Sequence, residues 1–228
     1  SYGEKIVLKD ITMTLEEGRI YGLLGENGVG KTTLLTLLCG LKKVKAGSID
    51  IDGHTPYDRE PSILGDLYYL SDEVPAVNMK AKDYAENYGK FWEGFDMSKF
   101  MTIMEELDND PNQKMNKMSF GQLKKTYIAF ALACNAKYLF MDEPTNGLDV
   151  IIAKDVRDFI LSMRDEGKCI ILSTHIFDLI EKTCNKVALM VDGKIIKNDN
   201  IENIMNGRSL EDAFYDIYTK QLAKEDSQ

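Results

Sequence analysis

The sequence of 228 residues predicts an α/β fold built on a parallel sheet. Short apolar runs of buried-strand type recur along the chain, at 20–24, 67–70, 138–141 and 169–172. A segment with apolar residues at helical spacing, 156–163, separates the last two runs. The first run is followed by a glycine-rich loop and then by a leucine-rich segment, which gives the order strand, loop, helix. Together these observations favour a sheet whose connections are helices.

Turn signals and changes in composition define the remaining elements. Residues 5–24 are expected to pair as strands around a turn at 16–18, forming an N-terminal antiparallel β subdomain, and Asp52-Gly53 marks a second turn. From about 79 to 107 the strand signals give way to Ala, Glu, Lys, Tyr and Met, which predicts an inserted helical subdomain. A helix over 123–134, a C-cap at Gly167, a hairpin over 186–197 and a final helix from about 210 complete the prediction.

Length and composition indicate one domain. With 44% hydrophobic residues the chain can bury a full core. We expect a single domain over 1–228, with the α/β core at 1–71 and 136–228 and the helical subdomain at 72–135. The net charge of −9 disfavours a nucleic-acid partner. No apolar run is long enough to span a bilayer, and no signal peptide is apparent.

The cysteines and the start of the chain give two further expectations. The four cysteines form no C-x-x-C pair and stand beside apolar residues, so we expect reduced, buried thiols of a cytosolic protein and no metal site of cysteines and histidines. The chain begins Ser1-Tyr2-Gly3 without Met, and its first apolar alternation is at Ile6 and Leu8. We expect a trimmed N-terminus that lacks an upstream strand.

The glycine-rich loop after the first apolar run reads Gly25-Glu26-Asn27-Gly28-Val29-Gly30-Lys31-Thr32-Thr33. Glycines let backbone N–H groups converge on an anion, and the N-terminus of the next helix adds positive potential. Lys31 can reach the β- and γ-phosphates, and the Thr32 hydroxyl can hold Mg²⁺. A glycine loop alone is often only a turn, but the Lys-Thr pair in this context indicates a P-loop. The sequence thus predicts a P-loop NTPase core of the RecA-like type that binds a nucleoside triphosphate.

Polar residues follow the two later apolar runs, where the strands of a parallel sheet would end at the same edge. Asp142 is placed to hold Mg²⁺ and Glu143 to orient or deprotonate the attacking water. His175 follows the next strand and could contact a γ-phosphate. An isolated Asp-Glu pair is usually a solvated loop and a lone histidine is usually structural, but both lie downstream of a P-loop. Lys31, Glu143 and His175 are therefore the expected catalytic residues, and His54 is expected to be structural.

Residues 118–122, Met-Ser-Phe-Gly-Gln, precede the helix over 123–134. Locally, Ser119 and Gln122 form the pattern of a capping box, which is a sufficient structural explanation by itself. Together with the P-loop, Asp142-Glu143-Pro144-Thr145, Asn146-Gly147-Leu148-Asp149 and Ser173-Thr174-His175, however, the segment resembles the LSGGQ signature of ABC ATPases. The motifs occur in the family's order and cover nearly the whole chain.

The resemblance implies ATP and Mg²⁺ as cofactors, and a head-to-tail homo- or heterodimer with two ATP molecules between the subunits. Tyr2 would stack on adenine. The phosphates would be bound by residues of the P-loop: Gly25, Asn27, Gly28, Gly30, Lys31, Thr32 and Thr33. The opposite subunit would supply Ser119 and Gly121 to the γ-phosphate, Gln122 to support that loop, and Asp149 to communicate across the interface. Thr32, Asp142 and Asp72 would hold the metal.

The chain departs from the family's pattern at three positions. Met118 replaces Leu, which changes the volume little. Phe120 stands where Gly is common, so its side chain must point away from the phosphate. Ser71-Asp72 replaces the usual Pro-Gln of the Q-loop; Asp72 can accept from a metal-bound water, and Glu73 is a possible substitute.

Two groups of side chains have a structural and a functional interpretation. An aromatic stripe at helical spacing is usually core, but here it could also line the groove that receives a coupling helix of a membrane partner: Tyr84, Tyr88, Phe91, Trp92 and Phe95. The lysines are expected on solvated faces: Lys42, Lys43, Lys45, Lys124 and Lys125.

The expected function is the ATPase subunit of a membrane transporter, cytoplasmic and held at the inner face of the membrane by a separate transmembrane permease. The alternative is a soluble ABC ATPase of DNA repair or translation, which would carry long coiled-coil inserts, zinc modules or two nucleotide-binding halves. The ending over 209–214 is similar to the exporter branch that moves drugs, antibiotic peptides or sodium. A degenerate, slowly hydrolysing half of a heterodimer is a third possibility, against which Glu143 and His175 argue.

Overall fold

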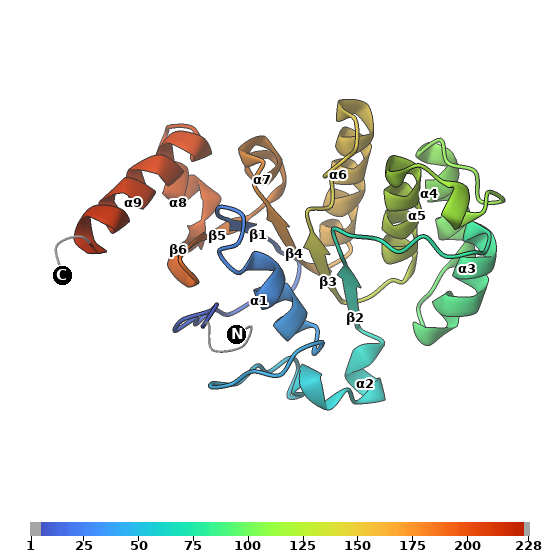
Figure 1. Cartoon of the computed structure of the whole chain (residues 1–228), viewed down its shortest axis with the longest axis horizontal. Coiled ribbons are helices and arrows are strands. Elements are labelled where there is room, and N and C mark those ends of the chain that lie inside the picture. Colours follow the sequence, from blue (N-terminus) through green and yellow to red (C-terminus); the bar gives the residue numbers. More distant parts are fainter. Residues whose placement is uncertain (1–5, 226–228) are drawn as a thin grey trace.

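The computed structural model describes residues 6–225, in which a six-stranded sheet carries helices on both faces (Figure 1). The strand order is β2-β3-β4-β1-β5-β6, and every pair is parallel except β5–β6. The strands are β1 (Ile20–Leu24), β2 (Leu67–Leu70), β3 (Tyr138–Asp142), β4 (Cys169–Thr174), β5 (Lys186–Val191) and β6 (Lys194–Asn200). The predicted α/β fold with a mainly parallel sheet is confirmed.

The longer described helices lie where the sequence predicts helices, whereas the short ones at 61–64, 177–183 and 201–205 are not predicted. They are α1 (Lys31–Leu38), α2 (Pro61–Leu64), α3 (Ala81–Tyr88), α4 (Met97–Glu106), α5 (Phe120–Ala133), α6 (Val150–Asp165), α7 (Phe177–Thr183), α8 (Ile201–Met205) and α9 (Leu210–Glu225). Helices α3, α4 and α5 lie together beside the β2 edge of the sheet, whereas α8 and α9 lie at the opposite edge (Figure 1).

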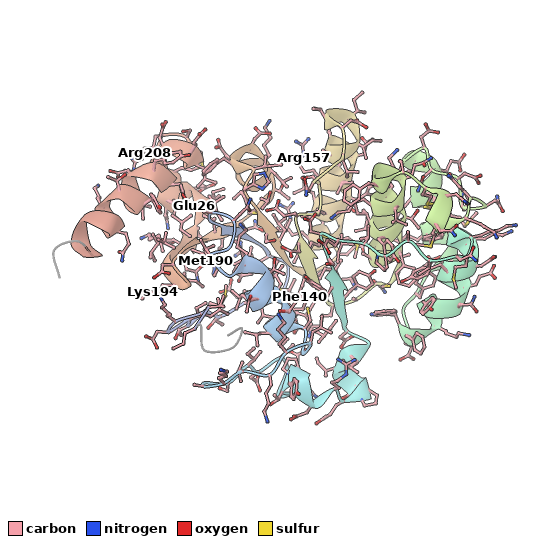
Figure 2. All side chains as sticks on the ribbon, in the orientation of Figure 1. Glu26, Phe140, Arg157, Met190, Lys194 and Arg208 are labelled. Carbon is pink, nitrogen blue, oxygen red and sulfur yellow. The ribbon has the colours of Figure 1, made fainter. Side chains whose placement is uncertain are left out.

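The sheet separates two hydrophobic cores because successive strand residues point to opposite faces. Ile20 and Leu24 of β1 pack on the side of α5, α6 and α7, while Tyr21 and Leu23 pack against leucines of α1. Every residue of β1, β3 and β4 is buried. Phe140 of β3 illustrates this position at the centre of the molecule, in contrast to Arg208 at its outside (Figure 2).

Helix termini are closed by the predicted local devices. Ser119 Oγ accepts from Gln122 N (3.2 Å), and Gln122 Oε1 accepts from Ser119 N (2.9 Å), so the capping box is confirmed. At the end of α6, Gly167 has φ +85°, its N–H donates to Arg164 O, and Lys168 N donates to Met163 O. This is a Schellman motif with Gly167 at the left-handed position just after the helix, as predicted.

The predicted pairing of strands over 5–24 is wrong for most of its length. Only β1 is a strand; residues 6–19 are extended or turn without one, and Lys9 N donates to Gly193 O as an isolated bond. The alternate side chains of Ile11, Met13 and Leu15 still pack against the α1 core. The alternation thus reports burial of one side of the segment, not a hydrogen-bonded ladder, because a ladder also needs a partner strand. At the second turn only a single bridge forms, between Ile51 and His54.

Two expectations from composition can be compared with residues 6–225. No helix in that range is both long and apolar enough to cross a membrane. All four cysteines are free and buried, as predicted. Burial raises the pKa of the Cys169 thiol to about 12, which keeps it protonated and unreactive at neutral pH.

Candidate active site

Three adjacent strands bring the predicted site residues to one edge of the sheet. Strands β3, β4 and β1 are neighbours, and the register pairs Asp142 with Ser173 and Leu24 with Thr174. The carboxyl ends of these parallel strands therefore meet, as ligand sites of open α/β sheets require. A cavity of about 780 Å³ lies at this edge, and its lining includes Asn27, Gly28, Gly30, Lys31, Thr32, Thr33, Asp72, Asp142 and Glu143.

The P-loop has the backbone that its glycines permit. Gly28 and Gly30 have φ of +85° and +114°, in the region that side chains disfavour, and Gly30 is the N-cap of α1. Lys31 is 7% exposed, and its Nζ donates to Gly25 O (2.7 Å) and Glu26 O (3.2 Å). Burial lowers the pKa of Lys31, and the charges of Glu143 and Asp142 oppose that shift. The loop thus holds its ammonium group inward, toward the cavity's carboxylates.

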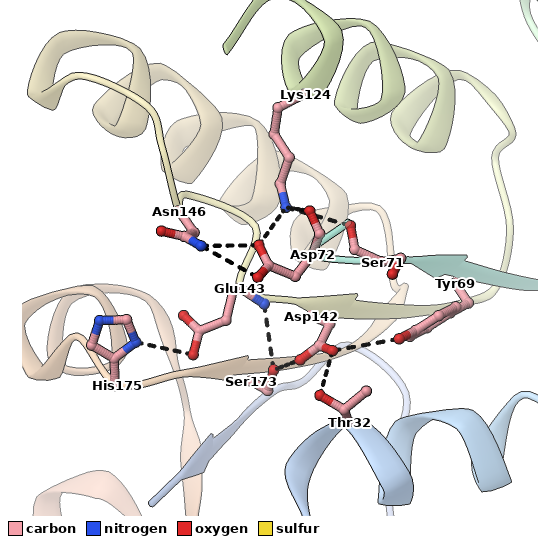
Figure 3. A network of polar contacts seen from close by, with 10 residues as sticks. All are labelled: Thr32, Tyr69, Ser71, Asp72, Lys124, Asp142, Glu143, Asn146, Ser173 and His175. Atoms are coloured by element: carbon pink, nitrogen blue, oxygen red, sulfur yellow. Dashed lines mark hydrogen bonds and ion pairs between the residues drawn. The ribbon is translucent and has the colours of Figure 1, made fainter. Parts of the chain in front are cut away.

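Asp142 is the centre of a cluster of oxygen ligands (Figure 3). Its carboxylate is buried and accepts from Thr32 Oγ1 (2.6 Å), Tyr69 OH (3.4 Å) and Ser173 Oγ. Burial, followed by the charge of Asp142, raises the pKa of Tyr69, which therefore stays a neutral donor. The hydroxyl and carboxylate oxygens converge from α1 and β3, and such hard ligands are those that Mg²⁺ prefers.

Glu143 and His175 lie side by side (Figure 3). His175 Nδ1 is 3.1 Å from Glu143 Oε1. Glu143 Oε2 is buried without a hydrogen-bond partner, which marks an oxygen available to another group. The Glu143 backbone has φ +44° and its N–H donates to Ser173 O (3.0 Å). His175 Nδ1 is therefore paired with a carboxylate oxygen, and 54% of its side chain is exposed.

Asp72 lines the cavity, but its carboxylate already has protein partners. Lys124 Nζ donates to Asp72 Oδ1 (3.2 Å), and Asn146 Nδ2 lies 3.1 and 3.3 Å from the two carboxylate oxygens. Glu73 is exposed and does not line this cavity. The assignment of Lys124 to a solvated face is wrong, since its side chain is 0% exposed. Burial lowers the pKa of Lys124, and the neighbouring Asp72 opposes that shift.

Sequence reasoning missed Lys124 because single lysines on helices are usually solvated. A signal was present, however. Beyond its first turn α5 is apolar on almost every side, and ten of its residues are buried. A helix surrounded in this way leaves no solvated face for a lysine, so a partner within the protein was to be expected.

The signature residues lie away from this cavity. Ser119, Gly121, Gln122 and Asp149 are not among its lining residues. Asp149 is the N-cap of α6 and accepts from Ile151 N (3.0 Å) and Ile152 N (3.1 Å). A Cβ added at Gly147 would lie 2.5 Å from the Phe120 ring, so that ring packs onto Gly147. Tyr2 lies outside the described residues.

The aromatic stripe divides between core and surface. Tyr84, Trp92 and Phe95 pack against the core, while Tyr88 and Phe91 are 40% and 69% exposed. A second cavity of about 310 Å³ runs along the stripe and the segment after β2; its lining includes Tyr68, Ser71, Glu73, Val74, Tyr84, Tyr88, Phe91 and Trp92. The core interpretation is therefore confirmed for Tyr84, Trp92 and Phe95, and the groove for a membrane partner stays a prediction for Tyr88 and Phe91.

Comparisons with known proteins identify the family. Residues 8–146, more than half of the chain, match the profile of the family described as ABC transporter. The chain is 30% identical to the lantibiotic transport ATP-binding protein SrtF of Streptococcus pyogenes, over 92% of this chain and 94% of that protein. It is 31% identical to a fluoroquinolones export ATP-binding protein of Mycobacterium tuberculosis, over 89% of this chain and 68% of that protein.

Solved structures agree on the fold. The structure of an ATP-binding subunit of an ABC transporter superposes with a TM-score of 0.85 at 21% identity, covering 95% of both chains. The sequence relatives are transport proteins of an exporter-like branch, so the alternative of a DNA-repair or translation ATPase is excluded. The chain therefore belongs to the ABC transporter family, as an ATP-binding subunit that hydrolyses ATP to drive membrane transport.

Proposed function

We propose that the chain is the ATPase subunit of an exporter and that the cavity at the P-loop edge is its nucleotide site. The observation that carries the proposal is the convergence of Lys31, Thr32, Asp142 and Glu143 on that cavity. Two relatives are named for lantibiotic transport and for fluoroquinolone export, which supports a compound of one of these classes as cargo.

The oxygen cluster fits a Mg²⁺ ion. Thr32 Oγ1 and Asp142 Oδ2 would hold the ion, directly or through water, and Asp72 lines the same cavity. When bound, Mg²⁺ neutralises charge on the β- and γ-phosphates. Lys31 would leave the carbonyls of Gly25 and Glu26 to bind phosphate oxygens, which are stronger acceptors for an ammonium group.

The chemical step is an in-line attack of water on the γ-phosphorus, which breaks the bond to the oxygen bridging the β- and γ-phosphates and releases ADP. Glu143 Oε2 orients the water and accepts its proton, because this buried oxygen has no partner in the protein. His175 pairs with Glu143 Oε1 and is exposed. It is not among the residues that line the cavity, and in this proposal it contacts the γ-phosphate from beside Glu143. Catalysis then rests on positioning and charge stabilisation.

The functional unit in this proposal is a head-to-tail homo- or heterodimer. Ser119 and Asp149 do not line the cavity of their own chain, which supports a role at the cavity of a second subunit. Beside Asp149, Val150 and Ile151 are 87% and 73% exposed. Exposed apolar side chains next to a functional loop favour an interface. The whole chain would act as one ATPase domain, with 72–135 as its helical subdomain.

The transmembrane partner would bind the aromatic cavity of the helical subdomain. Tyr88 and Phe91 present apolar surface there, next to the segment that continues into Asp72. The chain would thereby sit at the cytoplasmic face of the membrane, with no nucleic-acid partner.

We expect Phe91→Ala to reduce co-purification of the permease from detergent extracts at least about tenfold, as loss of an aromatic interface anchor does. Tyr57→Ala is the control, because Tyr57 is an exposed aromatic residue that does not line this cavity. This variant should retain the permease. Equal retention by both variants would contradict this docking site.

Substitution of Glu143 tests the proposed chemistry. Glu143→Gln keeps the shape of the side chain but removes the base, so kcat should fall roughly 10²–10⁴-fold in a phosphate-release assay. The variant should bind ATP normally and accumulate as an ATP-bound dimer on gel filtration. An unchanged rate of hydrolysis would remove Glu143 from this role.

A further inference from the structure

Lys124 is a fully buried cation for which the proposed chemistry has no use. Its side chain is 0% exposed, and its Nζ donates to Asp72 O (3.0 Å), Asp72 Oδ1 (3.2 Å) and Ser71 O (3.4 Å). An ammonium group has three N–H donors, and each has an acceptor here. Because a buried charge without such partners is costly, the side chain is held in one orientation by the segment after β2.

The Asp72 carboxylate connects three segments that are distant in sequence (Figure 3). It belongs to the segment after β2, it binds Lys124 of α5, and it accepts from Asn146 of the loop after β3. The same carboxylate is 35% exposed and lines the nucleotide cavity beside Glu143. A single side chain therefore touches both the cavity and, through Lys124, the helix that begins at the signature loop.

The geometry of α5 carries this connection to the signature loop. Ser119 is the N-cap of α5, about one and a half turns before Lys124. Gly121 lies in the first turn, less than one turn before Lys124. A hydrogen-bonded helix of this length moves as a unit, so fixing Lys124 fixes the start of the helix. We propose that Lys124 is a positioning residue of the ATPase, which locks α5 and its signature loop to the nucleotide cavity through Asp72. This inference rests on the proposed dimer.

Electrostatics agree with this role. Five acidic residues line a cavity that must accept a triphosphate, namely Glu26, Asp72, Asp142, Glu143 and Asp192, and Lys31 lines it as well. Lys124, behind the cavity wall, compensates Asp72 without occupying the space for the nucleotide. An ion pair at this place thus holds the helix without adding net charge to the site.

The primary test is Lys124→Met, which keeps an unbranched apolar stem. We expect kcat to fall about tenfold or more, the scale of coupling between residues in one network, with the Kd of the monomer for a fluorescent ATP analogue within about twofold. Lys125→Met is the matched control, since Lys125 is the next residue of α5 and only partly buried. A kcat for Lys124→Met as high as that of the control would overturn the proposal.

A double-mutant cycle separates positioning from a loss of folding. Asp72→Asn and Lys124→Met are measured alone and together, and we expect the pair to lose less activity than the product of the two single losses. Losses that multiply would show that the two residues act independently, which contradicts the proposal. Should Lys124→Met unfold in circular dichroism, Lys124→Gln, which keeps donors for the carbonyls, replaces it in the same cycle.

Dimerisation distinguishes a failure here from a failure of the proposed function. In a Glu143→Gln background, ATP should produce a dimer on gel filtration, and Lys124→Met should raise the protein concentration needed for it about tenfold. If Glu143→Gln alone forms no dimer, the proposed dimer is wrong, and the kcat cycle still decides on Lys124. If both the dimer and kcat withstand Lys124→Met, the positioning role is wrong.

Discussion

Glu143 combines an unfavourable backbone conformation with an unpaired buried oxygen. A non-glycine residue at φ +44° costs on the order of 1 kcal/mol, and the N–H bond to Ser173 O holds it there. The turn directs the side chain away from β3 toward His175, while Asp142, one residue earlier, points to Thr32 (Figure 3). Two adjacent carboxylates are thereby separated into a metal ligand and a base in the proposed mechanism.

The pair of Glu143 and His175 leads to a prediction for His175→Ala. Without the imidazole, both Glu143 oxygens lack a protein partner, and the γ-phosphate loses a donor. We expect kcat to fall by about 10²-fold or more, as for removal of one donor to a developing charge, while the Kd for ATP changes little. Stopped-flow phosphate release and nucleotide titration measure the two quantities.

His54 supplies the control for this experiment. It is the other of the chain's two histidines and pairs with Glu60 (Nδ1–Oε2 2.8 Å), a carboxylate that does not line the cavity. His54→Ala should leave kcat unchanged. Equal losses in both variants would indicate general destabilisation, and a loss confined to ATP affinity in His175→Ala would place the imidazole in binding alone.

At the scale of elements, the sequence predicts strands well where they are buried on both faces. The runs that became β2, β3 and β4 are continuous and apolar, and each has a parallel neighbour on which to pack. Local chemistry also predicts the capping box at Ser119 and the glycine after α6. Parallel strands end at one edge of a sheet. The predicted strands therefore also predict that the P-loop and the residues after β3 and β4 lie close together.

The errors arise where long-range partners decide. Residues 6–19 alternate like a strand, but their backbone finds no ladder in the described part of the chain. Lys124 reads as solvated, yet its partner Asp72 lies 52 positions earlier. Neither the missing ladder of residues 6–19 nor the partner of Lys124 can be recognised from the local pattern. Both depend on what the fold brings close to the segment.

The turn at Asp52-Gly53 allows a pH-dependent prediction. Asp52 accepts from Lys137 Nζ (2.8 Å) and Tyr138 OH (2.8 Å), and the hydrogen bond from Lys137, then that from Tyr138, lowers the pKa of Asp52. The folded-state pKa lies below the unfolded value of about 3.9, so the stabilisation exists above that pH and disappears as the pH falls through the folded pKa.

Asp52→Asn should remove this stabilisation without breaking the turn, because asparagine also tolerates φ +52°. A partly exposed ion pair contributes at most about 1 kcal/mol, and we expect Tm to fall by about 2–4 °C at pH 7. The difference from the parent protein should shrink below about pH 4, where the unfolded carboxyl takes up a proton while the folded one is still ionised, and vanish below the folded pKa. Thermal unfolding at both pH values measures it, and an equal difference at both would assign the effect to the turn itself.

At the scale of the molecule, one chain of the proposed dimer would carry two halves of different sites. The P-loop edge has the groups proposed to bind phosphate and metal, and the signature loop and Asp149 lie away from it. Phe120 and Val150 are exposed near that loop, and the Phe120 ring covers Gly147. An arrangement of this kind leaves each proposed site incomplete until a second subunit supplies the missing half.

Ser119→Arg tests this arrangement. In the proposed dimer Ser119 faces the γ-phosphate bound by the partner, so a bulky side chain there should abolish ATP-driven dimerisation, while the monomer still binds ATP with a Kd within about twofold of the parent. Gel filtration with ATP in the Glu143→Gln background and nucleotide titration measure the two effects.

Ser119 is also the N-cap of α5, and losing the cap alone costs about 1 kcal/mol. Ser119→Ala removes that cap without adding bulk, so it separates stability from obstruction. If ATP binding to the monomer disappeared in Ser119→Arg but not in Ser119→Ala, Ser119 would have to act on the nucleotide of its own chain, and the composite site would be wrong.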